Sequence, residues 1–297
     1  MDRLQALEIF IAVADGGSFA NAARALRLSP SAATRAIAEL EARHGTALFH
    51  RSTRAVALTS AGSGFLPVAR RVMADLAEAE RTLVGATADP QGQLLVTAPV
   101  LFGRLHVLPV VNELIDRHPA LSVEMMLVDR NIRIVEEGVD VAVRIGHLAD
   151  SMMQAVRIGR VRQMLVASPA YLARFGVPSS AEALTSHRLI ASTGPRAPSE
   201  WHIGGRAVAV KPRLRVNTVA AAVAAAEAGT GIANLLSYQS ADAIAAGRLL
   251  EILPIDDPEW LPISLLFDAS RGRNAALRAF IAAMRTATRT ALGEGGQ

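Results

Sequence analysis

Apolar residues recur at a spacing of three and four along the start of the chain and predict three short helices. The first runs from about residue 3 to residue 14. Ser18 is placed to cap a second helix over residues 19–26. Ser29-Pro30, a capping residue followed by a proline, is placed to open the third. This spacing predicts a small helical domain at the beginning of the chain.

The third helix has two opposed faces, one apolar and one small and polar. The apolar stripe, which we expect to be buried, consists of Ala33, Ala36, Ile37 and Leu40. The same spacing two residues earlier places the opposite stripe in solvent; it consists of Ser31, Thr34, Arg35 and Ala38. Such a face can approach another macromolecule closely, as the second helix of a helix-turn-helix does with DNA. An ordinary three-helix bundle with a polar outer face is the alternative.

A basic segment directly after these helices favours the helix-turn-helix. Residues 47–59 have the pattern of two short strands around Ser52-Thr53, a β-ribbon wing with Arg51 and Arg54 near its tip. Six arginines lie between residues 24 and 54, against two glutamates. This local positive charge suits phosphate groups.

The pattern then changes to one long helix with a narrow apolar seam. Its positions step by four and three in heptad fashion: Phe65, Ala69, Val72, Leu76, Ala79 and Leu83. A seam of this width predicts pairing with a second copy of the helix, and packing on its own domain is the alternative. A two-fold dimer would carry two DNA-reading heads and would bind an inverted-repeat site.

From about residue 93 the pattern alternates between strands and helices, which predicts parallel sheets. Two similar sets of elements follow one another and predict two lobes with a cleft between them. The last helix, about residues 274–290, is expected to fold back onto the first lobe. Thr97 to Phe102 and Asn217-Thr218 each precede a predicted helix, where free backbone N–H groups suit an anion. Arg144 ends a strand on the same side, and a structural ion pair is its alternative role.

Composition narrows the chemistry. The 297 residues are 51% hydrophobic and include no cysteine, which excludes disulfides and thiolate metal sites. No histidines stand at metal-ligand spacing, no catalytic grouping is visible, and we expect no metal, no cofactor and no enzymatic activity. The net charge of +4 comes with a single lysine, Lys211, an arginine bias that codon usage explains. No secretion signal or membrane-length apolar run of about 20 residues appears, so we expect a cytoplasmic protein.

The residues described so far resemble the LysR-type transcriptional regulators along essentially the whole chain. The segment from MDRLQALEIF to RAVALTSAG (1–62) is similar to that family's N-terminal block. Further family-like pieces are GVDVAVRIG (138–146), LVASPAYLARFG (165–176), AGTGIANLLSYQ (228–239) and AAGRLLEIL (245–253).

The resemblance implies an α/β protein with an N-terminal winged helix-turn-helix (1–59), a linker and dimerisation helix (60–87) and a two-lobed, periplasmic-binding-protein-like effector domain (92–297). Lobe I would comprise about 92–161 and 268–297, and lobe II about 162–267. The implied function is sequence-specific binding of double-stranded DNA, modulated by a small-molecule effector in the interlobe cleft. The implied assembly is a homodimer through the linker helix and a homotetramer, with RNA polymerase as a further partner and no membrane contact.

The candidate site residues fall into two groups. The DNA-binding group is Ser18, Ser29, Pro30, Ser31, Thr34, Arg35, Arg51, Thr53 and Arg54. The effector-binding group is Thr97, Ala98, Pro99, Val100, Leu101, Phe102, Val128, Arg144, Asn217 and Thr218. Pro99 departs from the family, which often has a serine or threonine there, and it offers neither a hydroxyl nor an N–H. A carboxylate effector is therefore in question, and two alternatives remain: a regulator without effector response, or a solute-binding protein or enzyme.

Overall fold

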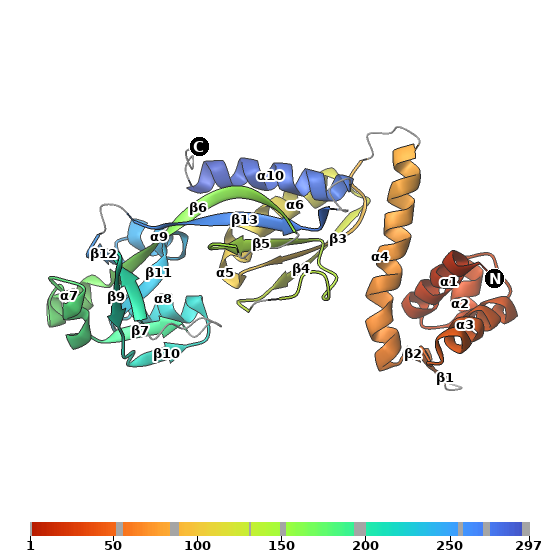
Figure 1. Cartoon of the computed structure of the whole chain (residues 1–297), viewed down its shortest axis with the longest axis horizontal. Coiled ribbons are helices and arrows are strands. Elements are labelled where there is room, and N and C mark those ends of the chain that lie inside the picture. Colours follow the sequence, from red (N-terminus) through yellow and green to blue (C-terminus); the bar gives the residue numbers. More distant parts are fainter. Residues whose placement is uncertain are drawn as a thin grey trace. The chain divides into compact units, whose positions relative to one another are not determined.

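The computed structural model divides the chain into two units, Met1–Ala88 and Asp89–Gln297, and we describe each by itself (Figure 1). The described residues are 2–51, 56–83, 89–130, 132–148, 153–192, 200–254, 258–269 and 274–292.

The first unit is a three-helix head with a two-stranded ribbon and one long helix. Its elements are α1 (Arg3–Gly16), α2 (Phe19–Ala25), α3 (Pro30–His44), β1 (Phe49–Arg51), β2 (Val56–Leu58) and α4 (Ser60–Leu83). The ribbon is antiparallel, with Phe49 opposite Leu58. Phe10 is fully buried at the centre of the core, with the rings of Phe49 and Phe65 both 5.3 Å away, centroid to centroid. Helix, wing and long helix therefore share one core.

A close backbone approach fixes where α4 begins. A Cβ atom on Gly62 would lie only 2.1 Å from the carbonyl oxygen of Leu48, so glycine alone fits there. The Thr59 hydroxyl donates to the Ala47 carbonyl at 2.7 Å and accepts from the Gly62 N–H at 3.0 Å. These contacts tie the start of α4 to the residues just before β1.

The second unit begins with a parallel β-α-β arrangement. Its first part contains β3 (Gly92–Ala98), α5 (Val100–Phe102), a π-helical turn (Gly103–Val107), α6 (Leu108–Arg117), β4 (Leu121–Leu127) and β5 (Val141–Ile145). Its second part contains β6 (Gln154–Ala167), α7 (Pro169–Phe175), a 3₁₀ turn (Glu182–Ser186), β7 (Leu189–Ser192), β8 (Glu200–Ile203), β9 (Arg206–Ala209) and β10 (Leu214–Val216). It continues with α8 (Val219–Glu227), β11 (Ile232–Leu236), α9 (Ser237–Ala245), β12 (Leu250–Ile252), β13 (Trp260–Phe267) and α10 (Ala275–Leu292).

Nine of the described strands form one sheet, in the order β10-β7-β11-β6-β13-β5-β3-β4, with β12 also paired to β6. Each lobe contains parallel strand pairs: β3 with β4 and β5, and β7 with β10 and β11. The expectation of purely parallel sheets is wrong, because β6 and β13 pair antiparallel with each other and with their neighbours. These two long strands connect the lobes, and the strand content of residues 154–163 and 260–267 was not predicted.

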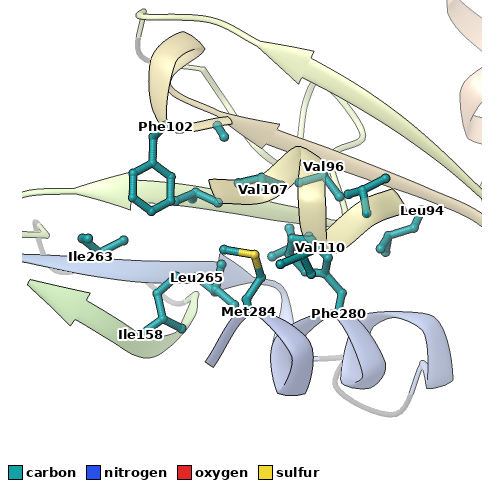
Figure 2. Packing of buried hydrophobic residues seen from close by; sticks show 14 of the residues in the cluster. Leu94, Val96, Phe102, Val107, Val110, Ile158, Ile263, Leu265, Phe280 and Met284 are labelled. Carbon is teal, nitrogen blue, oxygen red and sulfur yellow. The ribbon is translucent and has the colours of Figure 1, made fainter. Parts of the chain in front are cut away.

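The C-terminal helix packs on the first lobe, as predicted. Figure 2 shows Phe280 and Met284 of α10 against the side chains of the sheet, and both are fully buried. The Thr288 hydroxyl donates to the Ile158 carbonyl at 2.6 Å. α10 follows β13 and packs beside α6, so this last helix covers the same sheet that begins with β3.

Among the described helices, none is long and apolar enough to cross a membrane.

Candidate functional site

The first candidate site is the outward face of α3. Ala33, Ala36 and Ile37 are fully buried and Leu40 nearly so, which confirms the predicted apolar stripe. On the opposite side Ser31 and Arg35 are exposed, and Thr34 is half-buried. The helix therefore presents a small hydroxyl and a guanidinium to solvent while its other face anchors it to α1 and α2.

Hydroxyl groups fix the two helix starts on this side. Ser18 accepts a hydrogen bond from the Ala20 N–H and Ser29 from the Ala32 N–H, each at 3.2 Å, so both act as caps. Pro30 is the first residue of α3. The Thr34 hydroxyl donates to the Pro30 carbonyl at 2.9 Å and so is occupied within the helix. Ser31 and Arg35 are the exposed polar side chains of this face nearest the capped end, and the Ser31 hydroxyl is hydrogen-bonded to that of Ser29 at 3.1 Å.

The wing is held to α3 by a contact that the sequence did not reveal. One carboxylate oxygen of Glu41 accepts hydrogen bonds from the backbone N–H groups of Leu48 at 2.8 Å and Phe49 at 3.1 Å. In the sequence Glu41 stood out only as a negative charge among arginines. The backbone of Arg51 ends β1, while Thr53 and Arg54 lie outside the described residues.

The predicted apolar seam of α4 has two parts with different surroundings: its start packs in the core of the helical head, and its continuation is exposed. Phe65 and Ala69 pack into the core of the helical head, which is the alternative role that the sequence left open. An ion pair between Arg70 and Asp15 holds the same part of α4 to the end of α1. One turn further, Val72 is exposed, as is Val68 beside the seam (39% and 41%). The apolar surface available to a partner therefore begins after the first turns of the helix.

The second candidate site is a cavity of about 560 Å³ in the second unit. Its wall comes from the carboxyl ends of β3, β4 and β5, the segment after β4, the end of β7, the start of α8 and part of β13. The wall residues are Pro99, Val128, Asp129, Arg130, Ile132, Arg133, Ile134, Val135, Glu136, Arg144, Ile145, Gly146, His147, Leu148, Met153, Ser192, Val219 and Leu266. Its volume is in the range of small-molecule sites.

Of the predicted effector residues, Pro99, Val128 and Arg144 line this cavity. Thr97 does not, because its hydroxyl is buried and donates to the Met126 carbonyl at 2.8 Å. Ala98, Leu101 and Phe102 belong to the hydrophobic core below, since the chain turns into a helix immediately after Pro99.

The remaining three predicted residues lie beside the cavity. Val100 is exposed, and its N–H donates to a carboxylate oxygen of Asp129 at 3.0 Å. Thr218 is exposed and caps α8 through the Ala221 N–H at 3.3 Å, with Asn217 exposed before it. The wall is formed instead by the next residue, Val219.

The arginines of the wall are paired within the protein. Arg130 donates two hydrogen bonds to the carboxylate of Glu137, each at 3.0 Å, and these bonds hold the pKa of Glu137 below its usual value. Arg133 pairs with Glu136 at 2.9 Å. Arg144 donates to the Ile132 carbonyl at 3.1 Å. Wall residues after β4, from Asp129 to Glu136, were missed by the sequence reasoning, although they follow a strand end as Thr97 to Phe102 do.

An aromatic cluster connects the π-helical turn to α9. The ring of Phe102 lies 4.7 Å from that of His106 and 5.3 Å from that of Tyr238, centroid to centroid. Burial raises the pKa of the Tyr238 hydroxyl to about 12 and lowers the pKa of the His106 imidazole. The Nε2 atom of His106 is buried and has no hydrogen-bond partner among the described residues.

The chain is similar to known proteins along its whole length. The model of the LysR substrate binding domain matches residues 87–289, and the model of bacterial regulatory helix-turn-helix proteins of the lysR family matches residues 4–63. The transcriptional regulator CrgA of Neisseria meningitidis serogroup C is 30% identical over 93% of both chains. A transcriptional repressor of Pseudomonas aeruginosa is 31% identical over 95% of this chain and 90% of its own.

Solved structures agree. The structure of CrgA from Neisseria meningitidis aligns with a TM-score of 0.63 and 27% identity, over 96% of this chain and 98% of that one. The full-length Vibrio cholerae virulence activator AphB aligns with a TM-score of 0.60 and 23% identity over 96% and 99%, and so supports the fold alone.

Proposed function

The chain belongs to the LysR family of DNA-binding transcriptional regulators with a small-molecule effector domain, and from that premise we propose how its own residues divide the work. Residues 1–59 bind DNA, 60–87 join two copies, and 92–297 hold the effector. The protein acts in the cytoplasm by binding and not by catalysis. RNA polymerase is a further partner.

The observation that best supports the DNA contact is that one face of α3 is buried in the core while the opposite face is exposed. Arg35 and Ser31 read base edges in the major groove, and Ser29 and Pro30 lie where the helix start approaches a phosphate. Ser18 and Thr34 support the same surface, with Arg51, Thr53 and Arg54 on the wing. A footprint on the promoter next to the coding gene tests this: we expect protection of an inverted repeat, and protection lost when residues 1–59 are deleted.

Dimerisation rests on the exposed apolar residues of α4. Val72 lies beyond the turns that pack on the helical head, and a second copy of α4 would bury it. Val72→Asp should therefore dissociate the dimer and lower the affinity for an inverted repeat, because a charge would be buried without a partner. Light scattering measures the mass, and Val177→Asp, at an exposed valine of the second unit outside the cavity wall, serves as the control. A homotetramer would form from two such dimers.

The effector site is the cavity with Pro99, Val128 and Arg144 in its wall. A thermal-shift screen of small metabolites, followed by a footprint with each hit, tests it. We expect a compound that raises the melting temperature and also changes the footprint. The second candidate is a regulator without effector response; Pro99, with no hydrogen-bond donor at the start of α5, favours it. A screen with no hit that alters the footprint would support this second candidate.

A further inference from the structure

Asp129 differs from the other charged residues of the cavity wall. It lies two residues after the end of β4, and one of its oxygens accepts the Val100 N–H at 3.0 Å. Among the described residues it forms no ion pair with an arginine or a histidine. Its one described partner is therefore an uncharged backbone N–H group, which leaves the carboxylate charge uncompensated.

Two of the three arginines of the wall are in the opposite situation, because each is paired with a carboxylate. Arg130 is held by both oxygens of Glu137, Arg133 by Glu136, and Arg144 by a backbone carbonyl. Arg144 is also close enough to Glu137 to help lower its pKa. A carboxylate ligand would have to compete with internal carboxylates for the guanidinium groups of Arg130 and Arg133. A cationic ligand would meet no such competition at Asp129.

The rest of the wall is mainly apolar. Apolar side chains reach it from both parts of the sheet and from α8, for example Pro99, Val128, Ile145, Val219 and Leu266. An apolar ligand body would be removed from water here, at about 25 cal/mol per Å² of buried apolar surface. A charged group buried beside such a wall needs an opposite charge as its partner.

We propose that Asp129 determines the effector class of this cavity: it binds an apolar molecule that carries a cationic amine, and it disfavours carboxylates. The inference rests on the proposed role of the cavity as the effector site. The amine donates to the carboxylate of Asp129 in the cavity wall, and a charge-assisted hydrogen bond of this kind is about twice as strong as a neutral one. Pro99 offers no hydrogen-bond donor, so the wall has no anion-binding group at this position.

The test uses three probes that share one apolar body: phenylbutylamine, phenylbutanol and phenylbutanoate. Their binding to the full-length protein is measured by thermal shift and by calorimetry. Asp129→Asn removes the charge but keeps an oxygen that can accept the Val100 N–H. Asp116→Asn, at an exposed carboxylate on α6, is the matched control.

We expect the amine to raise the melting temperature of the wild type more than the alcohol does, and the carboxylate least. In Asp129→Asn the dissociation constant of the amine should rise about tenfold or more, while that of the alcohol changes little. Asp116→Asn should behave as the wild type. The proposal is overturned if the amine fails to stabilise the wild type, if it binds Asp129→Asn equally well, or if the carboxylate binds the wild type better than the amine.

Band-shift measurements on the same preparations keep the two proposals apart. Asp129→Asn should still bind the promoter DNA, because the substitution lies outside the DNA-binding unit. A wild type that binds the amine but no DNA would reject the proposed function and leave the selectivity of Asp129 standing. The reverse result would reject the selectivity alone.

Discussion

The two candidate sites are built in different ways. The proposed DNA-facing surface belongs to one helix, α3, and its residues lie within seven positions of one another, from Ser29 to Arg35. The cavity wall takes residues from seven segments that span residues 99 to 266. A surface on one helix is determined by helical periodicity. A cavity depends on how many segments meet, and no local pattern encodes that.

The two sites also treat charge differently. The arginines of the DNA-binding unit that the structure describes are largely exposed, including Arg24, Arg27, Arg35 and Arg43. Those of the cavity wall are tied to Glu136, Glu137 and a carbonyl. Exposed arginines suit a partner as highly charged as DNA. Because the arginines of the cavity wall already have partners, the other groups of the wall would select a small ligand.

The first prediction, which has the largest expected effect, tests whether the two units unfold independently of each other. Phe10→Ala should lower the free energy of unfolding of the first unit by about 3–5 kcal/mol, because a fully buried ring is removed from between Phe49 and Phe65. Specific DNA binding should be lost at the same time. Both tryptophans, Trp201 and Trp260, lie in the second unit. Their fluorescence should therefore show an unchanged urea transition, while circular dichroism shows the loss of helix.

Phe280→Ala is the matched control, since Phe280 is equally buried in the core of the second unit. It should shift the tryptophan transition and leave the helical head folded. If Phe10→Ala shifted the tryptophan transition by the same amount, the two units would unfold together in one cooperative transition. They would then not be independent in stability.

Sequence reasoning worked best where one element decides the outcome. The stripe from Ala33 to Leu40 is buried as its spacing predicted, and α10 begins and ends within two residues of its predicted bounds. It worked least well for β6 and β13. Arginines and a glycine break the apolar run in the first half of β6, and β13 contains Pro262 just before a register shift between Ile263 and Ser264. Only the pairing of these strands across both lobes makes them strands.

The cavity was predicted in its position but only partly in its residues. Thr97 to Phe102 were expected to line it together, yet Pro99 alone does. The side chains of the others are buried, except that of Val100, which is exposed beside the cavity. Asp129 was missed because a single aspartate after a strand carries no pattern of its own. Its importance comes from Val100, 29 residues earlier, a proximity that only the fold creates.

The second prediction concerns the base-reading role of α3. Arg35→Ala should weaken binding to the specific site by about 1–3 kcal/mol if the guanidinium hydrogen-bonds to a base. The fold should be unaffected, because Arg35 is exposed. Fluorescence anisotropy with the specific site and with random DNA measures the two affinities. Arg117→Ala, at an exposed arginine of α6, loses the same charge in the other unit and should change neither. An equal loss on both DNAs would leave Arg35 with phosphate contact only.

The third and smallest effect is a pH dependence confined to the second unit. Burial lowers the pKa of His106 from its ordinary value of 6.5, so as the pH falls the unfolded chain takes up this proton before the folded one does. The stability that depends on neutral His106 is therefore complete above about pH 6.5 and declines as the pH falls through the lower folded pKa. Protonation would also place a charge between Phe102 and Tyr238, where the buried Nε2 has no described partner.

His106→Phe keeps an aromatic ring at this position and removes the proton, so it should flatten the fall in stability below about pH 6.5. Urea unfolding followed by tryptophan fluorescence, at steps from about pH 7.5 to 5.5, measures the difference from the wild type. His202→Gln, at an exposed histidine of β8, should leave the profile as it is. An unchanged profile in His106→Phe would assign the pH dependence to other groups. A flattened one would show that the contact between the π-helical turn and α9 requires a neutral imidazole, a requirement with no counterpart in the exposed face of α3.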